Sequence, residues 1–385
     1  AYNYYELYTK FGDVPYTTKV LSIKESMSIA RTAKATVIAN VLADLDEVIN
    51  GNYLPTSYDA DNKGRITRWA AMAIKAKIYL FEGNWTQVKN ITSTIMTEGG
   101  FKLFGSYAGL FEIANEYNSE VILDAQYRPT SREHQMMYVF LPPTLGGYSQ
   151  LSPLQELVDS YIMLDGKTIK ETGTSFDESH PYANRDPRLK ATVMYTGNSY
   201  TLADGTEVVI NCEKGEGKDG YGVGSDCSAT GYYIKKYWDN TYRATLYSGL
   251  NPILIRYADI LLMNAEALAE LGELDKTAWD ATIKPIRDRA GFTLASALEF
   301  PEGASKDKLI EIVRNERRSE LALEGHRHKD IIRWRIADNV LNGWCHGLKT
   351  NDVVGTDDGY VRVENRTFNA NKHYLWPIPQ AERDL

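Results

Sequence analysis

Several motifs on which catalysis or nucleotide binding commonly depends are missing from this sequence. It contains no GxSxG elbow, no P-loop and no GxGxxG motif ahead of a helix, so serine hydrolases, NTPases and dinucleotide enzymes have no signature here. No run of about 18 apolar residues occurs, which leaves no candidate for a membrane-spanning helix. Surfaces that bind nucleic acid are positively charged, whereas this chain has a net charge of −8, so no nucleic acid is expected as a partner.

Cysteine and histidine are also scarce. The three cysteines form no CxxC pair and no zinc spacing, and only Cys212 and Cys227 lie in one loop. A disulfide between these two would suit an oxidising compartment, and two reduced thiols are the alternative that the sequence leaves open. His326 and His328 form an HxH motif, but on a helix their rings point in different directions, so a structural role is expected rather than a metal site.

One glycine-rich loop, residues 211–226, carries several acids. Carboxylate oxygens are the ligands that Ca²⁺ prefers, yet the spacing of these acids does not match an EF-hand loop. We therefore expect no cofactor, with calcium in this loop as the alternative. The acids are Glu213, Glu216, Asp219 and Asp226.

Hydrophobic residues make up 43% of the 385 positions, which is enough to bury a large core. The sequence also contains a repeated helical pattern. Two pairs of amphipathic segments are each broken by a glycine, Gly83 in one pair and Gly272 in the other, with small residues at equivalent helix positions. This arrangement resembles the tetratricopeptide (TPR) helix–turn–helix repeat, with a third unit expected to use the first of the helices. The expected helices are 29–50, 66–82, 86–98, 257–271 and 276–290.

Between these helical regions the chain is rich in Gly, Pro, Asn, Ser, Thr and Tyr, which predicts long loops. Short strands are expected within it at 120–126, 189–195, 207–210 and 232–237. The predicted fold class is mainly α, with TPR-like helical hairpins packed against a loop-rich irregular region with short β-strands. The predicted division is a TPR-like region at 1–100, a loop-rich ligand-facing region at 101–252 and a second TPR-like region at 253–385.

The most highly charged stretch is 309–335, where a helix over 309–324 is predicted to pair with 329–341. Glu316, Glu320 and Glu324 are four residues apart and share one helix face, so they repel one another unless arginines neutralise them. A solvated surface is one interpretation, and Glu320 with Glu324 as the two carboxylates of a glycoside hydrolase is another. The interpretation that we favour is a partly buried ion-pair network. Its predicted members are Arg317, Glu320, Glu324, Arg327 and Asp330.

Eight motifs, in order along nearly the whole chain, resemble those of one family. Four lie towards the C-terminus: ILIRYADILLMNAEALAELGE, PIRDRAGF, LIEIVRNERRSELALEGHRHKDIIRW and HYLWPIPQAE. Four lie upstream: KFGDVPYTT, AMAIKAKIYLFEGNW, LVDSYIMLDGK and NRDPRLKATVMY. The chain is thereby similar to the SusD/RagB family. One departure is His326 and His328 flanking Arg327, where the family tends to have an aromatic residue.

The resemblance implies a non-catalytic, cell-surface lipoprotein of the outer membrane that binds glycan, or in some members peptide, for nutrient uptake and polysaccharide utilization. It would deliver its ligand to a SusC-like TonB-dependent transporter. The chain begins without Met at AYNYYELYTK, within an expected helix, so a fragment or processed form is expected. The lipid-anchored cysteine and about the first quarter of a typical member would then lie upstream of Ala1.

Ligand contacts are expected from exposed aromatic residues of the loop-rich region, since an aromatic face stacks on a sugar and Asn or Asp bonds its hydroxyls. The candidates are Tyr148, Trp238, Asn240 and Tyr242. The alternative for Trp238 and Tyr242 is that they pack the loop onto the helices. Glycan capture is the leading functional hypothesis, and a glycoside hydrolase and a peptide-binding or scaffold member of the same fold are the alternatives.

Overall fold

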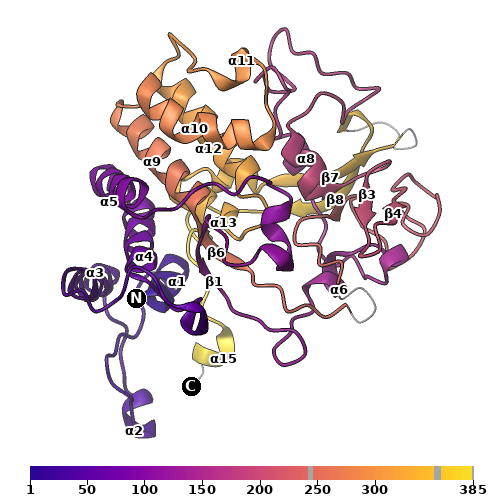
Figure 1. The fold of residues 1–385 in the computed structure, drawn as a ribbon. Helices are drawn as coiled ribbons and strands as arrows, with labels where there is room; N and C mark the ends of the chain where they lie inside the picture. The colour runs from indigo at the N-terminus through magenta and orange to yellow at the C-terminus, as the bar shows by residue number, and fades with distance from the viewer. Residues whose placement is uncertain (242–245, 351–356, 384–385) are drawn as a thin grey trace. The chain divides into compact units, whose positions relative to one another are not determined.

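The computed structural model describes residues 1–241, 246–350 and 357–383 (Figure 1). The chain forms two compact units. The first unit comprises Ala1–Gly100, His326–Asn342 and Thr367–Leu385, and the second comprises Phe101–Gly325 and Gly343–Arg366. Both units therefore draw on the C-terminal range, 253–385, that the sequence suggested as one region. The three predicted regions stay a prediction, because compactness alone does not show which segments fold independently.

The first unit is built from helices. Their order along the chain is α1 (Tyr2–Phe11), α2 (Ile23–Ser26), α3 (Lys34–Asn50), η1 (Ala60–Asn62), α4 (Arg68–Phe81), α5 (Trp85–Glu98), α13 (Arg327–Arg333), α14 (Ala337–Val340) and α15 (Gln380–Arg383).

The helical hairpin α4–α5 shows why these residues form this unit. The side chain of Thr67 accepts a hydrogen bond from the backbone N–H of Ala70, which caps the start of α4. Ala70, Ala73 and Ala76 are completely buried, and their small side chains let a neighbouring helix approach closely. Asn84 then caps α5 in the same way as Thr67 caps α4.

The second unit contains the other helices and all the strands that the structure describes. Its helices are η2 (Gly109–Phe111), η3 (Ile113–Asn115), α6 (Met136–Phe140), η4 (Pro143–Leu145), α7 (Gln155–Val158), α8 (Pro187–Thr192), α9 (Tyr257–Leu271), α10 (Lys276–Ala290), α11 (Ala295–Leu298), α12 (Lys306–Glu320) and η5 (Asp357–Gly359). Its strands are β1 (Val121–Asp124), β2 (Val193–Met194), β3 (Ser199–Thr201), β4 (Glu207–Val209), β5 (Tyr233–Ile234), β6 (Ile253–Arg256), β7 (Gly343–Lys349) and β8 (Tyr360–Arg366).

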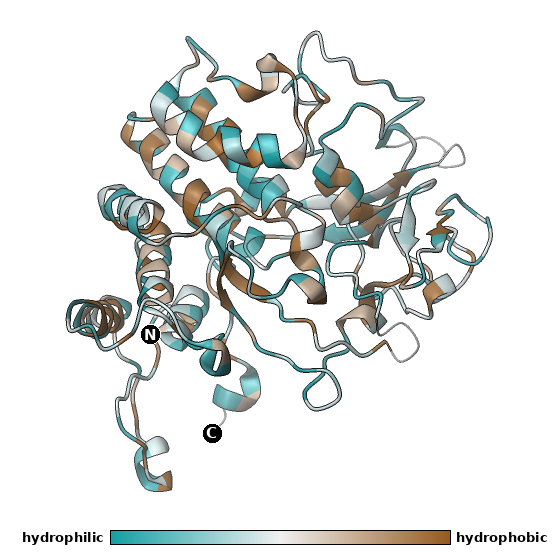
Figure 2. Ribbon diagram, in the orientation of Figure 1, coloured by the Kyte–Doolittle hydropathy of each residue, from teal (hydrophilic) through white to brown (hydrophobic). Residues whose placement is uncertain are grey.

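Helix α9 is the centre of the helical part of the second unit, where it packs against both α10 and α12 (Figure 1). Hydrophobic residues run along α9 and along the strand β6 that leads into it (Figure 2). Gly272 ends α9 in the left-handed conformation, with φ of 73°, which glycine adopts without steric cost. Asp275 then caps the returning helix α10 by accepting from Ala278 N–H.

The strands pair in antiparallel twos: β1 with β6, β2 with β5, β3 with β4 and β7 with β8. Typical register partners are Leu123 with Ile255 and Val193 with Ile234. The pair β2–β5 contributes Val193, Met194 and Tyr233 to a hydrophobic core rich in tyrosine, which packs the loops of this unit together. The predicted fold class, mainly α with TPR-like hairpins and a loop-rich region with short strands, is confirmed.

Some predicted elements differ from the structure. The segment 189–195 is mostly helix α8, because the Asp186 side chain caps it and Pro187 occupies its first position. Residues 29–33 are extended instead of helical, since the backbone of Thr32 bridges to Val14, and α3 begins at Lys34. The hairpin β7–β8 was not predicted at all.

The charged helix also differs in its bounds and its neighbours. Ser305 caps it, so α12 begins at Lys306, and it ends at Glu320 instead of Glu324. It packs against α8, α9 and α10. The segment 329–341, its predicted partner, lies in the first unit as α13 and α14, so the predicted pairing stays a prediction.

None of the helices in the described ranges is both long enough and apolar enough to cross a membrane.

Candidate functional site

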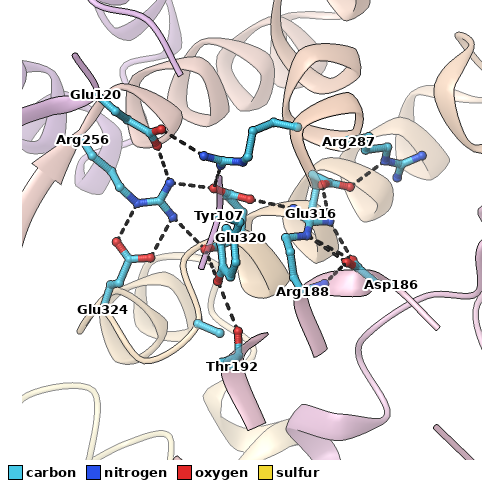
Figure 3. Close-up of polar contacts among 12 residues, drawn as sticks. Tyr107, Glu120, Asp186, Arg188, Thr192, Arg256, Arg287, Glu316, Glu320 and Glu324 are labelled. Atoms are coloured by element: carbon cyan, nitrogen blue, oxygen red, sulfur yellow. Dashed lines mark hydrogen bonds and ion pairs between the residues drawn. The ribbon is translucent and has the colours of Figure 1, made fainter. Parts of the chain in front are cut away.

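A buried ion-pair network fills the space between α12, α8 and β6 in the second unit (Figure 3). Glu320, with no exposed surface, accepts from Arg188 at 2.8 Å and from Arg256 at 2.6 Å, and also pairs with Arg289. Arg256 in turn holds Glu324 and Glu120, each at 2.7 Å. The network continues from Arg188 to Asp186 and Glu316, and from Glu316 to Arg287.

The acids of this network stay ionised although they are buried. Burial by itself would raise the pKa of Glu320, but the guanidinium groups of Arg289, Arg256 and Arg188 outweigh it and lower that pKa. The pKa of Glu324 is lowered in the same way, with Arg256 and then Lys236 opposing the effect of burial. The predicted ion-pair interpretation of Glu320 and Glu324 therefore agrees with the geometry of this unit.

The other predicted members take different places. Arg317 pairs with Asp259 of α9 at 2.6 Å, so it fastens α12 to α9 outside the Glu320 cluster. Asp330 pairs with Arg333 at 2.9 Å within α13, and Arg327, also on α13, lies over the Trp334 ring. Arg327 and Asp330 thus belong to the first unit, whereas the Glu320 cluster belongs to the second.

The same contacts bear on the catalytic interpretation of Glu320 and Glu324. A general acid or nucleophile has to reach a substrate, but Glu320 is fully buried and its carboxylate is held by three arginines. Both oxygens of Glu324 are bonded by Arg256, through Nε at 2.8 Å and Nη2 at 2.7 Å. These contacts favour the ion-pair interpretation of Glu320 and Glu324 over the glycosidase interpretation.

Lys236 also belongs to the network, although no lysine was among its predicted members. Its ammonium donates to Glu324 at 2.6 Å, to the Tyr107 hydroxyl at 2.9 Å and to the Ala322 carbonyl at 2.9 Å. Burial lowers its pKa to about 8, although Glu324 acts in the opposite direction. Keeping this charge in the core therefore costs free energy. Lys236 contributes through the hydrogen bonds that position its neighbours, and not through a net gain from its charge.

We expect Lys236→Met to lower the free energy of unfolding by only about 1–3 kcal/mol, because it removes a costly buried charge as well as the hydrogen bonds of the ammonium. Glu324 keeps both bonds from Arg256 in this variant. Urea denaturation followed by tryptophan fluorescence measures the change. Lys276→Met, at an exposed lysine, is the matched control and is expected to change the free energy by less than about 0.5 kcal/mol. A loss above about 5 kcal/mol would show instead that the ammonium is a main stabilising charge.

Among the predicted ligand contacts that the structure describes, Tyr148 is the best exposed, at 39%. Its ring lies 4.3 Å from that of Tyr138 at an angle of 33°, and its backbone N–H donates to the Tyr138 carbonyl at 2.9 Å. A hydrogen bond with Tyr148, and then burial, raises the pKa of Tyr138. We call Tyr138 and Tyr148 the tyrosine platform.

The backbone next to the platform is fixed by a close approach. A Cβ at Gly147 would lie 2.1 Å from the Leu141 carbonyl oxygen, so only glycine fits there. Leu151 N–H donates to the Val139 carbonyl at 3.0 Å on the other side of Tyr148. These contacts hold the backbone on both sides of Tyr148 in place.

The remaining predicted contacts are less open. The Trp238 indole N–H donates to the Thr201 carbonyl at 2.9 Å, and its ring packs edge-on against Tyr200 at 5.3 Å. These contacts favour the packing alternative for Trp238, while its role in binding stays a prediction. Asn240 is half-buried, and Tyr242 lies outside the described residues.

A pocket of about 600 Å³ in the second unit was not foreseen from the sequence. Its aromatic walls include the rings of Tyr182 and Tyr195, stacked 3.9 Å apart at 17°, together with Tyr232. Arg185 also lines it. We call this cavity the tyrosine pocket. The abundance of tyrosine was a visible signal, but the pocket joins segments from 155 to 360, which no local pattern brings together.

The loop considered for calcium does not gather its acids. Asp219 is buried and accepts from Thr144 N–H at 2.8 Å, whereas Glu213, Glu216 and Asp226 are exposed. Within the described ranges no three His, Cys, Asp or Glu residues form a group that would hold a metal ion. The thiols of Cys212, Cys227 and Cys345 are all free, so the reduced alternative holds.

Comparison with known proteins identifies the family. The model of the SusD family matches residues 110–385, and a second model, described as "Starch-binding associating with outer membrane", matches residues 1–80. The first match alone covers more than half of the chain. The chain therefore belongs to the SusD family, and the resemblance found in its sequence motifs is confirmed.

Individual relatives agree with this assignment. SusD-like protein P25 of Formosa agariphila is 28% identical over 362 residues, which are 88% of this chain and 62% of that protein. The chain thus spans under two thirds of the length of this relative. A crystal structure of a SusD-like carbohydrate binding protein from Bacteroides fragilis matches 99% of this chain and 76% of its own, with a TM-score of 0.87 and 29% identity. A second SusD-like protein of B. fragilis gives a TM-score of 0.81 at 28% identity, over 98% of this chain and 75% of its own.

Proposed function

We propose that this protein captures glycan at the outer-membrane surface by non-catalytic binding. Membership of the SusD family supports this, as does the B. fragilis neighbour that is described as carbohydrate binding. The description of the model that matches residues 1–80 names starch binding and the outer membrane, which agrees with the proposed location.

The observation that carries the proposal is the tyrosine platform. Tyr148 exposes about two fifths of its surface, and Tyr138 holds it through a ring contact and a backbone hydrogen bond. Exposed rings that are fixed in place offer flat apolar faces for the C–H side of sugar rings, and their hydroxyls bond sugar oxygens. Asn240, Trp238 and Tyr242 are further proposed contacts for the same glycan.

Delivery is the second part of the proposal. The captured glycan passes to a SusC-like TonB-dependent transporter, and a lipid anchor outside this chain holds the protein at the membrane. Co-purification of an outer-membrane β-barrel with the membrane-anchored form is the expected result. Recovery of the protein without any barrel, under conditions that preserve other outer-membrane complexes, would contradict this part only.

A polysaccharide panel separates glycan capture from its alternatives. In affinity electrophoresis, retention by at least one polysaccharide without release of reducing ends is the expected result. Release of reducing ends would support a glycoside hydrolase. Absence of both retention and release, with binding of a peptide library instead, would support a peptide-binding or scaffold member of the fold.

We expect Tyr148→Ala to weaken binding of the retained glycan by about 2- to 10-fold, because an aromatic contact of this kind contributes about 0.5–1.5 kcal/mol. The platform loses the ring that its neighbours hold in place. Isothermal titration calorimetry gives the dissociation constant. Tyr53→Ala, which removes an exposed tyrosine of the first unit, is the matched control. Equal affinities of the wild type and Tyr148→Ala would remove Tyr148 from the site.

A further inference from the structure

The tyrosine pocket contains a chain of hydrogen bonds whose direction is fixed from one end. The Asp159 carboxylate accepts from Gln155 Nε2 at 2.7 Å, so the amide oxygen of Gln155 points the other way. That oxygen accepts the hydroxyl proton of Tyr232 at 2.5 Å. The Tyr232 oxygen, having given its proton to Gln155, accepts from the Tyr182 hydroxyl 3.2 Å away.

The last member of the chain therefore has a defined hydrogen-bonding character. The Tyr182 proton is used by Tyr232, and the remaining lone pairs of Tyr182 Oη accept hydrogen bonds. Burial raises the pKa of Tyr182 to about 12, so its hydroxyl keeps the proton at neutral pH. A ligand group that bonds to this atom has to be a donor. Sugar hydroxyls are donors, whereas a carboxylate or a sulfate ester is not.

The positively charged side chains that line the pocket do not offset its preference for a hydrogen-bond donor, because they bond to other protein groups. The guanidinium of Arg185 donates to the backbone carbonyls of Val158, Tyr161 and Pro181, at 2.6 to 3.2 Å. These bonds tie the segment before α8 to α7, so Arg185 builds the wall. At the rim, Lys349 pairs with Glu178 at 3.2 Å.

The other charged residues at the rim also disfavour an anionic ligand. His180 is bonded to Asp177 at 2.8 Å. Glu213 adds a carboxylate to the lining and makes no ion pair within the described chain. An acidic sugar would meet this negative charge without a cation directed at it.

The walls suit the apolar faces of a sugar ring. The stacked rings of Tyr182 and Tyr195 are joined by Phe176 and Tyr360. In the part of the chain that the structure describes, the hydroxyls of Tyr195 and Tyr360 make no hydrogen bond to protein, so they are open to a ligand. A volume of about 600 Å³ lies within the range of small-molecule sites, roughly 300–1,000 Å³.

We propose that the tyrosine pocket is a second carbohydrate site, built from different residues than the platform, and that it takes an uncharged sugar residue that donates a hydroxyl proton to Tyr182 Oη. This inference rests on the proposed glycan capture and names the ligand class more narrowly, as a neutral rather than a uronic or sulfated sugar.

The test uses calorimetry on the whole chain with four probes: malto-, laminari- and xylo-oligosaccharides, which are neutral, and an oligogalacturonide, which is acidic. At least one neutral probe is expected to bind, and the acidic probe is expected to bind more weakly. Tyr182→Phe keeps the ring and removes its hydroxyl, which is both the proposed acceptor and the donor to Tyr232, so it is expected to weaken the neutral probe by about 3- to 10-fold. Tyr53→Phe, an equal change outside the pocket, is expected to leave affinity unchanged.

Three other results have distinct meanings. Binding of a neutral probe that Tyr182→Phe leaves unchanged, while Tyr148→Ala abolishes it, would overturn the pocket site and keep glycan capture. Tighter binding of the oligogalacturonide than of every neutral probe would overturn the neutral-sugar class. Failure of all four probes to bind, while the polysaccharide panel yields a retained glycan, would overturn the pocket site and keep glycan capture. Equal melting temperatures of the wild type and Tyr182→Phe establish that the fold is intact.

Discussion

Glu320→Ala is expected to lower the free energy of unfolding by about 3–5 kcal/mol, a large part of the roughly 5–15 kcal/mol that stabilises a typical domain. The variant leaves Arg188, Arg256 and Arg289 buried with one carboxylate fewer, and a neutral water molecule in its place would not balance their charge. Urea denaturation at pH 7 measures the effect. Glu324→Ala, which removes the partner of Arg256 and Lys236, is expected to act in the same direction.

The matched control lies on the same helix. Glu311 is exposed and pairs only with Lys308 across the surface of α12, so Glu311→Ala is expected to change stability by less than about 0.5 kcal/mol. The comparison separates burial from the loss of any glutamate on this helix. A Glu320→Ala or Glu324→Ala variant that kept its melting temperature but lost glycan binding would show that these acids belong to a binding site and not to the frame.

Acidification is expected to remove the same stabilisation gradually, beginning near pH 5. The pKa values of Glu316, Glu320 and Glu324 are all lowered in the folded state, since the neighbouring cations outweigh the effect of burial. Below about pH 4.5 the unfolded chain therefore binds more protons than the folded chain, and the free energy of unfolding falls as the pH falls. The stabilisation is fully present above the unfolded pKa and is lost towards the lower folded pKa.

Two other acids act in the opposite sense. Burial raises the pKa values of Asp124 and Glu116, so these groups favour the folded state at low pH. A net difference of one to three protons gives a slope of about 1.4–4 kcal/mol per pH unit. Urea titrations between pH 7 and pH 3 measure it. Glu320→Gln is expected to flatten the profile and Glu311→Ala to leave its shape unchanged. A stability that stayed constant from pH 7 to pH 3.5 would contradict the proposed charge state of the network.

The helical hairpins were predictable because their causes are local. Helices α9 and α10 have the predicted bounds, Tyr257–Leu271 and Lys276–Ala290, since periodic apolar residues, Gly272 and the Asp275 cap all lie within one short segment. Helix α8 was mistaken for a strand although Asp186–Pro187, a helix-start signal, was visible in the sequence. The β-forming residues of this segment favoured a strand, but the cap at Asp186 and the proline after it start a helix there.

The charged segment shows the limit of a helix-face argument. The four-residue spacing of Glu316, Glu320 and Glu324 correctly indicated that they share partners, but α12 ends at Glu320. Glu324 reaches Arg256 because Leu323 takes a left-handed backbone conformation, with φ of 63°, after the helix. The spacing of the acids predicted their grouping, while the turn that completes the network depends on how the segment packs.

The sequence by itself determined that this chain belongs to the SusD family and that it forms TPR-like hairpins, and the spacing of Glu316, Glu320 and Glu324 favoured an ion-pair network. Only the tertiary structure decided which arginines neutralise these acids, that the ring of Tyr148 contacts that of Tyr138, and that Tyr182 and Tyr360 line one pocket. The reason is physical: helix periodicity and capping act over a few neighbouring residues. The buried ion pairs of Glu320 instead join side chains that are 31 to 132 residues apart, and only the complete packing of the chain fixes their distances.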